Sequence, residues 1–300
     1  MEKIFIHEVG MRDGLQMESV TVSLETKIRW IENLAKSGID IIQLGSFVNP
    51  VKMPQMADTD DLFNYFKSEN KPENVILSGL VLNEKGMERG LECGVDMFCL
   101  GVSASETHSK KNTGMSVKDA TQRIIAIAKQ IMNTGKKLQV SVQSAFGCGF
   151  EGNIPEEKVF EIVKKYLNAG IKNISLADTA GHANPQKVER MFSTIKEFDI
   201  STELTCHFHN TYGMGMANCI SAMKTGVKYF ETAFGGLGGC PFTKLAAGNV
   251  CTEDFVHMLQ NMGQRNDIDI SEIIGVTNYA RGYFAKELPG HVYKSGPIKH

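Results

Sequence analysis

Short apolar, β-branched runs alternate with longer segments of helical periodicity along most of the chain. The runs expected to form strands are Ile4–Val9, Ile39–Leu44, Val75–Leu82, Val95–Val102, Leu138–Ser144, Ile171–Leu176, Thr202–Phe208 and Val227–Phe234. The segments expected to form helices are Leu24–Ser37, Met56–Lys67, Glu84–Cys93, Val117–Asn133, Glu156–Ala169, Pro185–Phe198, Gly215–Lys224 and Thr252–Met262. These patterns predict eight successive units of one strand and one helix.

The joints between these units favour a closed barrel. In four of them a single glycine separates the end of a helix from the next strand (Gly38, Gly94, Gly170 and Gly226), as a left-handed helix cap requires. Repeated units with short joints predict an α/β fold of the (β/α)8 TIM barrel type. A doubly wound open sheet is the alternative, but the Gly-rich first turn usual in such sheets is absent.

The last part of the chain departs from the repeat. We expect residues 1–265 to form the barrel and residues 266–300 to form a C-terminal helical extension, with one helix over Ile268–Glu287. This extension is a candidate lid or oligomer contact.

Composition narrows the classes of function. A chain of 300 residues with 42% hydrophobic content can form one large domain, and its net charge of -2 gives no indication of a nucleic-acid or membrane partner. No apolar run approaches the roughly 20 residues of a membrane span. The seven cysteines are scattered without a C-x-x-C pair, which argues against a disulfide framework and a zinc knuckle. We expect a cytoplasmic protein, with an organelle matrix as the alternative.

Two histidines near the end of the seventh expected strand are the first candidate for chemistry. Side chains two apart on a strand project to the same face, so His207 and His209 lie side by side. Two imidazoles at this spacing can hold one divalent cation. The alternative is a pair of hydrogen-bonded histidines on a half-buried strand.

Because chemistry in such barrels takes place at the carboxyl ends of the strands, polar residues after other strands become candidates too. Asp13, after the first strand, is the natural third metal ligand, and the amide oxygen of Asn249 can be the fourth. This mixed nitrogen and oxygen set suits Mg²⁺ or Mn²⁺. The alternative for Asp13 is a turn or an ion pair with Arg12, but the two histidines at the same mouth favour the metal.

Two further residues are candidates for the reaction itself. Arg12 presents a planar fork of donors that can stabilise an enolate or carboxylate oxygen. Cys240 lies in the Gly-rich stretch 234–242, where it can act as an acid over the site or simply be a small residue in a turn. Lys110 and Lys111 can meet nucleotide phosphates, although a solvated charge run is the simpler interpretation.

Several segments together give the chain a family resemblance. They are Val9–Gln16, Ser46–Val48, Pro54–Met56, Ser144–Cys148, Cys206–Gly213, Gly236–Pro241 and Gly248–Asn249. With these segments the chain resembles the 3-hydroxy-3-methylglutaryl-CoA lyases, which are metal-dependent aldolase-like barrels. The sequence Gly236-Leu-Gly-Gly-Cys-Pro241 points most specifically to the lyase branch.

The resemblance implies a divalent-metal-dependent cleavage of 3-hydroxy-3-methylglutaryl-CoA to acetyl-CoA and acetoacetate by a homodimer. It assigns the metal to Asp13, His207, His209 and Asn249. Arg12 would hold the enolate and Cys240 would protonate it, with Asp13 and His207 also in the catalytic set and His207 as a candidate proton carrier. The general base stays open. The residues expected to contact substrate are Gln16, Gln43, Ser46, Ser144, Thr179 and Gly239.

One position departs from the lyase pattern. The family motif Ile-Glu-x-x-Ser-Phe-Val appears here as Ile42-Gln43-Leu44-Gly45-Ser46-Phe47-Val48, so a neutral amide replaces a carboxylate. The change can weaken activity, shift the substrate to another 3-hydroxyacyl-CoA such as citramalyl-CoA, or be neutral. A condensing synthase is disfavoured because only about forty residues follow the barrel. A catalytically inactive acyl-CoA-binding barrel is disfavoured because the metal set is retained.

Overall fold

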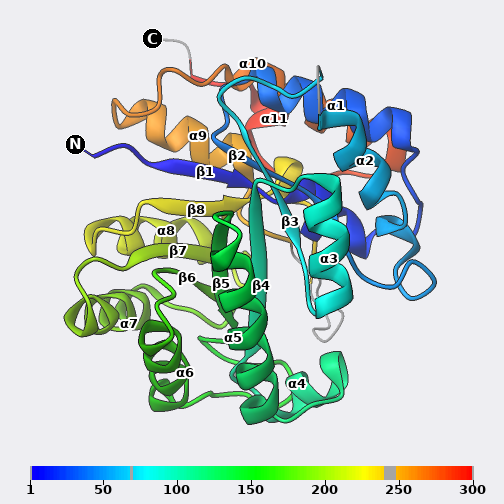
Figure 1. Cartoon of the computed structure of the whole chain (residues 1–300). Coiled ribbons are helices and arrows are strands. Elements are labelled where there is room, and N and C mark those ends of the chain that lie inside the picture. Colours follow the sequence, from blue (N-terminus) through cyan, green and yellow to red (C-terminus); the bar gives the residue numbers. More distant parts are fainter. Residues whose placement is uncertain (1, 68–69, 240–247, 299–300) are drawn as a thin grey trace.

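The computed structural model describes residues 2–67, 70–239 and 248–298. Eight parallel strands close into a barrel in chain order, with β1 paired to both β2 and β8 (Figure 1). The strands are β1 Phe5–Glu8, β2 Ile41–Ser46, β3 Ile76–Leu80, β4 Met97–Ser103, β5 Lys137–Gln143, β6 Asn173–Asp178, β7 Glu203–Phe208 and β8 Tyr229–Thr232. The predicted (β/α)8 TIM barrel is confirmed, and the open doubly wound sheet is excluded.

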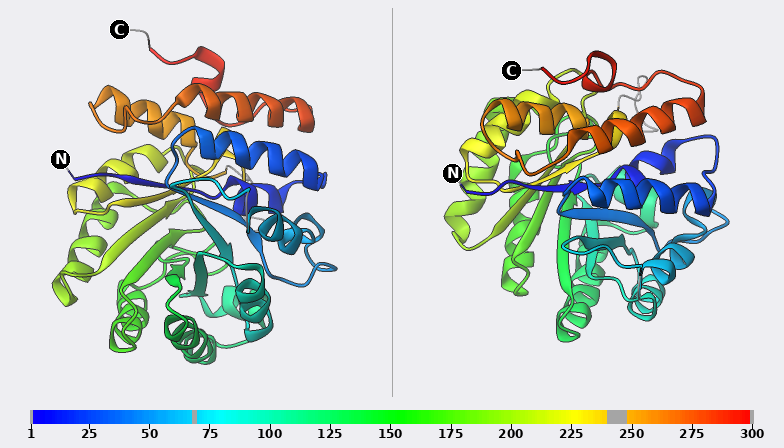
Figure 2. Two further views of the ribbon diagram at one scale, coloured as in Figure 1. Left: turned by 45° about the horizontal axis from the view of Figure 1, so that its top comes forward. Right: turned by 90° about the horizontal axis from the view of Figure 1, so that it is seen from above.

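Helices surround the barrel on its outer side (Figure 2). They are α1 Leu24–Lys36, α2 Thr59–Phe66, α3 Glu84–Cys93, α4 Glu106–Thr113, α5 Val117–Asn133, α6 Glu156–Asn168, α7 Pro185–Phe198, α8 Gly215–Lys224, α9 Thr252–Asn261, α10 Ile270–Phe284 and α11 Val292–Ser295. Among the described residues, none of these helices is long and apolar enough to span a membrane. Most of these helices bury an apolar stripe on their inner side, which is why their period could be read from the sequence.

Two parts of the outer layer differ from the sequence expectation. The helix expected over Met56–Lys67 begins later than predicted, at Thr59, because Pro54–Met56 form a short 3₁₀ turn before it. The hydroxyl of Thr59 donates to the carbonyl of Met56 at 2.8 Å and links this turn to the start of α2.

Helix α4 was not predicted, since its sequence of polar residues has no apolar period. Its start is fixed by Ser105, whose hydroxyl accepts the His108 N–H at 3.1 Å.

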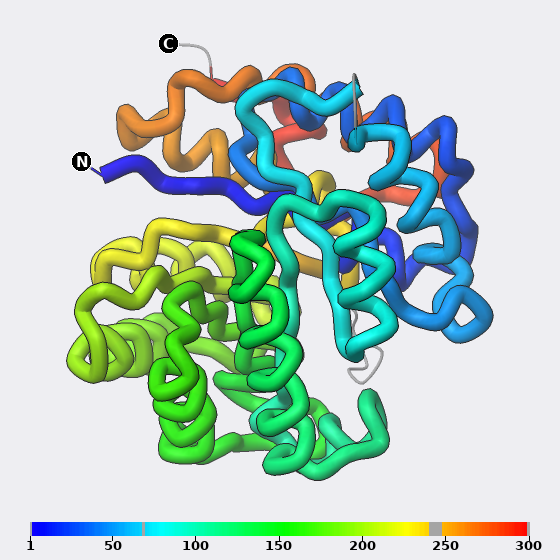
Figure 3. The backbone as a smooth tube through the Cα atoms, in the orientation of Figure 1, coloured from blue at the N-terminus to red at the C-terminus, as the bar shows by residue number. Residues whose placement is uncertain are grey.

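The C-terminal segment packs along the first helix. Figure 3 shows the orange tube of α10 running beside the blue tube of α1. Trp30 of α1 meets the rings of Tyr283 and Phe284 edge-on, with centroids 5.9 and 6.3 Å apart. Before α10, the buried Arg265 donates to the Ile4 carbonyl at 2.7 Å and to Asp40 at 2.6 Å. The division at residue 265, and a role of residues 266–300 as lid or oligomer contact, stay predictions.

A buried carboxyl group links the end of β1 to the segments that follow β8. Glu8 accepts the N–H of Gly10 at 2.6 Å and that of Phe234 at 3.1 Å. Its other oxygen lies 2.5 Å from the Thr252 hydroxyl, which lies 2.8 Å from the Thr232 hydroxyl. The Thr232 hydroxyl can donate to Thr252, and the Thr252 hydroxyl can then donate to Glu8. These bonds lower the pKa of Glu8, but burial outweighs them and raises it to about 8.

This raised pKa predicts a pH dependence of stability. Between the ordinary value of 4.5 and about 8 the folded state keeps a proton that the unfolded state has lost, so the free energy of unfolding falls as pH rises. We expect a loss of a few kcal/mol across this window, at about 1.4 kcal/mol per pKa unit. Urea unfolding at pH 5 and pH 8 measures it.

The variant Glu8→Gln should reduce that pH slope because its amide does not titrate. Part of the pH dependence of the free energy of unfolding should remain in this variant, since burial also raises the pKa of Glu253 to about 7. Glu88→Gln, on the exposed side of α3, is the matched control and should leave the slope unchanged. An equal slope in Glu8→Gln and the natural protein would contradict the assignment.

Candidate active site

Two histidines and one aspartate converge at the carboxyl end of the barrel. His207 lies in β7 and His209 directly after it, with their Nε2 atoms 3.0 Å apart. The Oδ2 atom of Asp13 lies 3.9 Å from Nε2 of His207 and 3.7 Å from Nε2 of His209. All three side chains are buried, and their ligand atoms lie within 4.8 Å of one another. The prediction that these groups share one barrel mouth is confirmed.

Asp13 reaches this position through an unusual turn. The residues Gly10–Gly14 form one π-helical turn directly after β1, a feature that often occurs at functional sites. The Oδ1 atom of Asp13 accepts hydrogen bonds from Nη1 of Arg12 and, at 3.3 Å, from Nε2 of Gln16. The Oδ2 atom of Asp13 faces the two histidines. The ion pair with Arg12 and the candidate metal site therefore coexist, because they use different oxygens of one carboxylate.

Asn249 is brought to the site by a short bridging segment. The N–H of Val250 donates to the Phe208 carbonyl at 3.0 Å, and the Asn210 N–H donates to the Gly248 carbonyl at 2.9 Å. Asn249 consequently pairs with His209 as an isolated bridge beside the end of β7. The predicted fourth ligand thus stands next to the other three.

The side-chain amide of Asn249 uses its NH₂ group in hydrogen bonds, whereas its oxygen has no partner among the described residues. Its Nδ2 atom donates to Oδ2 of Asp13 at 2.9 Å, and its Oδ1 atom is buried without a hydrogen-bond partner among the described residues. Leaving such an acceptor unpaired is costly. Gly238 packs against this amide with a φ of +109°, and a Cβ there would come within 2.6 Å of Nδ2. The close fit therefore depends on a glycine at this position.

The donor set fits a divalent cation. Two imidazole nitrogens, one carboxylate oxygen and one unpaired amide oxygen make a mixed site of the kind that Mg²⁺ and Mn²⁺ use together with water. Burial raises the pKa of Asp13, but Arg12 and the two histidines outweigh it and hold that pKa well below its ordinary value. Burial lowers the pKa of His209. These shifts favour an anionic Asp13 and a neutral His209, which are the forms that bind metals.

A residue that the sequence did not reveal supports His207. Glu231 of β8 lies with Oε2 2.8 Å from Nδ1 of His207. Burial lowers the pKa of His207, but the hydrogen bond and charge of Glu231 outweigh it and raise that pKa above the ordinary value. The sequence of β8 shows that Glu231 is charged, but it does not show that His207 is the residue it contacts.

Arg12 lies beside the candidate metal ligand Asp13 and has donors that are not in use. Its Nε atom donates to Oε1 of Gln43 at 2.5 Å, and its Nη1 atom bonds Asp13. Gln43 is only 1% exposed and belongs to β2. Arg12 has five donors, and its Nη2 atom makes no hydrogen bond within the described part of the chain. The guanidinium can therefore bind an additional oxygen without losing its present partners.

The remaining predicted residues lie at the same end of the strands but not all in contact. Ser144, with a φ of +54°, donates its N–H to the Thr179 hydroxyl at 3.1 Å. Ser46 ends β2, and its buried hydroxyl has no hydrogen-bond partner in the described structure. Gly239 follows the turn after β8, with a φ of +158°. Cys240 lies outside the described residues.

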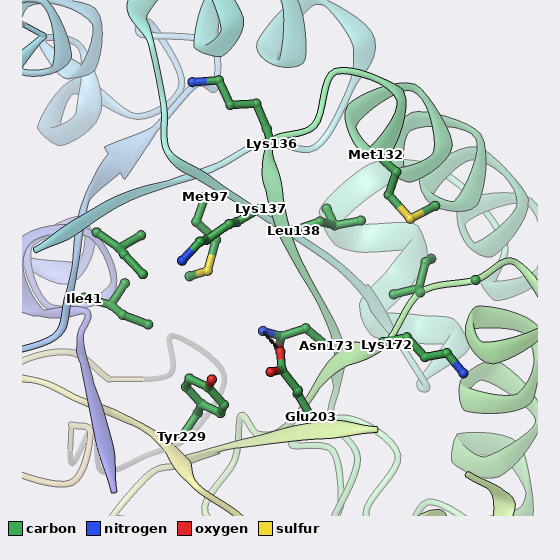
Figure 4. Close-up of a pocket in the computed structure, with 13 residues that line it drawn as sticks. Ile41, Met97, Met132, Lys136, Lys137, Leu138, Lys172, Asn173, Glu203 and Tyr229 are labelled. Atoms are coloured by element: carbon green, nitrogen blue, oxygen red, sulfur yellow. Dashed lines mark hydrogen bonds between the residues drawn. The ribbon is translucent and has the colours of Figure 1, made fainter. Parts of the chain in front are cut away.

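A cavity of about 380 Å³ occupies the opposite end of the barrel (Figure 4). Its lining includes the first residue of seven strands, namely Ile41, Ile76, Met97, Lys137, Asn173, Glu203 and Tyr229. The histidines stand at the other end of β7. Since catalysis in these barrels belongs to the carboxyl ends of the strands, this cavity is separate from the candidate active site.

Comparison with known proteins assigns the family. A family model described as HMGL-like matches residues 3–279. The chain is 34% identical to the hydroxymethylglutaryl-CoA lyase of Bacillus subtilis, over 98% of both chains. It is 33% identical to the (R)-citramalyl-CoA lyase of Chloroflexus aurantiacus, over 99% of this chain and 96% of that one.

The fold agrees with these relatives. A solved HMG-CoA lyase of Acinetobacter baumannii, in complex with coenzyme A and 3-methylmalate, superposes with a TM-score of 0.92 and 36% identity, covering 99% of this chain and 96% of that one. Likeness over the whole length, in sequence and in structure, leaves one assignment. The chain belongs to the HMGL-like family.

Proposed function

We propose that this protein is a divalent-metal-dependent carbon–carbon lyase that cleaves 3-hydroxy-3-methylglutaryl-CoA to acetyl-CoA and acetoacetate. The observation that carries the proposal is the convergence of Asp13, His207 and His209 at the barrel mouth, next to Arg12 with free donors. The HMGL-like family and the hydroxymethylglutaryl-CoA lyases at about 34% identity support it.

Asp13, His207, His209 and Asn249 would hold the cation, for which we propose Mg²⁺ or Mn²⁺. When bound, this ion supplies Lewis acidity that lowers the pKa of the substrate's tertiary hydroxyl. Asp13 also holds the guanidinium of Arg12 in place through its second oxygen. One carboxylate would therefore serve two purposes: Oδ2 of Asp13 would bind the cation, and Oδ1 holds Arg12 next to it.

The cleavage involves two proton transfers, one from the tertiary hydroxyl and one to C2. A base removes the proton of the tertiary hydroxyl, and the electron pair left on that oxygen forms the new carbonyl of acetoacetate. The C2–C3 bond breaks at the same time, and its electron pair passes to acetyl-CoA as an enolate. Free donors of Arg12 hold the enolate oxygen. Cys240 returns a proton to C2. As a ligand through Nε2, and with Nδ1 on Glu231, His207 has no free nitrogen, so we assign proton removal to another group.

Residues around the mouth would contact the rest of the substrate. We propose this role for Gln16, Gln43, Ser46, Ser144, Thr179 and Gly239; Gln43 lies within β2, Ser46 ends it, and the others follow strands at the carboxyl end of the barrel. An acyl-CoA substrate agrees with the coenzyme A held by the Acinetobacter baumannii relative. A homodimer and a cytoplasmic location remain predictions.

One observation favours a second candidate, cleavage of citramalyl-CoA to acetyl-CoA and pyruvate. In that substrate the free carboxylate is attached directly to the carbinol carbon. Gln43 is neutral and bonds Arg12, so this part of the site carries one negative charge fewer than the lyase motif would give. A relative named (R)-citramalyl-CoA lyase is 33% identical. The hydroxymethylglutaryl-CoA lyases are nevertheless the better-supported assignment.

Parallel turnover of the two substrates separates these candidates. With Mg²⁺ or Mn²⁺ present, we expect a higher kcat/KM for 3-hydroxy-3-methylglutaryl-CoA than for citramalyl-CoA. Gln43→Glu should widen this preference about tenfold or more, because about 1.4 kcal/mol of charge repulsion against the closer carboxylate is enough for that change.

Gln186→Glu provides the matched control, since it adds the same charge on an exposed position of α7. It should leave both substrates unaffected. Faster cleavage of citramalyl-CoA by the natural protein would replace the first proposal by the second. Cleavage of neither substrate would remove both.

A further inference from the structure

The strand next to the histidines supplies an acidic side chain to one of them only. Glu231 of β8 lies with Oε2 2.8 Å from Nδ1 of His207. By contrast, Nδ1 of His209 is buried without a hydrogen-bond partner among the described residues. We propose that Glu231 is a positioning residue that fixes the tautomer and orientation of His207 for metal binding.

The chemistry of a neutral imidazole explains how this works. The ring carries one N–H and one lone pair, and a carboxylate only accepts hydrogen bonds. Glu231 therefore keeps the proton on Nδ1 of His207, which leaves the lone pair on Nε2. That nitrogen faces the other two candidate ligands, 3.0 Å from Nε2 of His209 and 3.9 Å from Oδ2 of Asp13. Carboxylate partners of this kind commonly orient metal-ligating histidines.

Glu231 is itself held in a polar layer inside the barrel. It is paired in register with His7 of β1 on one side and with His207 of β7 on the other. Its Oε1 atom accepts from Nε2 of Gln139 and lies 3.7 Å from Nδ1 of His7. His7 in turn bonds the Ser78 hydroxyl at 2.8 Å through Nε2. The hydrogen bond from Gln139 therefore holds Glu231 in a fixed position inside the barrel.

This layer gives the two histidines different freedom. The Nδ1 atom of His207 is bonded to a carboxylate that Gln139 of β5 holds in place, whereas Nδ1 of His209 has no hydrogen-bond partner among the described residues. We therefore expect His207 to be set in its binding orientation before any cation arrives. The inference rests on the metal centre of the proposed function but not on the substrate.

The variant Glu231→Gln tests this directly with Mn²⁺ as the probe. It keeps the volume of the side chain, but its NH₂ group can donate to Nδ1 and so favours the tautomer whose Nε2 cannot bind a metal. We expect the dissociation constant for Mn²⁺, measured by electron paramagnetic resonance on metal-stripped protein, to rise about 10- to 100-fold. Imidazole ¹⁵N shifts should report the Nδ1–H tautomer of His207 in the natural metal-free protein and its loss in the variant.

Glu203→Gln is the matched control, because it makes the same change at the exposed start of β7. It should leave the Mn²⁺ affinity unchanged. Glu231→Asp retains the charge on a shorter side chain and should fall between the two, and it carries the test if Glu231→Gln does not fold. An affinity within twofold of the natural protein, with the tautomer of His207 unchanged, would overturn the inference.

Failure of the inference and failure of the proposed function give different results. Mn²⁺ binding that depends on Glu231, in a protein that does not cleave 3-hydroxy-3-methylglutaryl-CoA, supports the inference and removes the lyase proposal. If the protein is an active lyase but Glu231→Gln binds Mn²⁺ as tightly as the natural protein, only the inference about Glu231 is overturned.

Discussion

Replacing Asp13 by Asn should lower turnover of 3-hydroxy-3-methylglutaryl-CoA by about three orders of magnitude. A metal ion contributes several kcal/mol to stabilising the transition state, and each 1.4 kcal/mol or so corresponds to a factor of ten. Asp13 is the only carboxylate in the cluster with His207 and His209, so the variant removes the one anionic ligand among the described residues. Steady-state kinetics at several Mn²⁺ concentrations measure the effect.

The control must separate loss of the metal from loss of the fold. Asp96→Asn makes the same change at the start of β4, where Asp96 accepts the Leu77 N–H at 3.0 Å. Its turnover should stay near that of the natural protein. If Asp13→Asn retained more than a tenth of natural turnover at low Mn²⁺ concentration, Asp13 would not be a metal ligand.

Arg12→Lys should lower kcat about 10²- to 10³-fold with a much smaller change in KM. Loss of one donor to a developing oxyanion costs about this factor in other enzymes. A lysine keeps the charge but not the planar fork that bonds Gln43 through Nε and Asp13 through Nη1 while leaving Nη2 free. Kinetics of the purified variant, with Mn²⁺ affinity measured in parallel, give the result.

Arg89→Lys is the matched control because Arg89 forms an ion pair with Asp60 on the outer helices. It should leave kcat unchanged. Retention of natural kcat in Arg12→Lys would argue against a role for Arg12 at the enolate. A fall in kcat caused only by weaker Mn²⁺ binding would assign Arg12 to holding Asp13 instead.

The barrel could be predicted because every unit repeats the same physical signals. Helices α5, α7 and α8 begin and end as expected. Helix α5 has a clear apolar stripe, α7 has a proline in its first turn, and Gly226 follows α8. The π-helical turn at Gly10–Gly14 was not predicted, because no known pattern of side chains distinguishes it from a loop. The polar helix α4 was missed for a related reason, since its sequence has no apolar residues that could show a helical period.

The candidate site was predictable to the extent that it depends on strand ends. In a parallel barrel, the carboxyl ends of all strands lie at the same end of the molecule, so residues far apart in sequence can meet there. This rule was enough to predict that Asp13 lies close to His207 and His209. Glu231 could not be found in this way, because its contact with His207 depends on the register between β7 and β8. A shift by one residue would turn its side chain out of the barrel.

Cleavage of 3-hydroxy-3-methylglutaryl-CoA by metal-stripped protein, before and after addition of Mg²⁺ or Mn²⁺, tests the central claim most directly. We expect no turnover without the cation and, after its addition, formation of acetyl-CoA and acetoacetate in equal amounts. Absence of these products with either cation, in a folded protein that binds the metal, would contradict the assignment as a hydroxymethylglutaryl-CoA lyase.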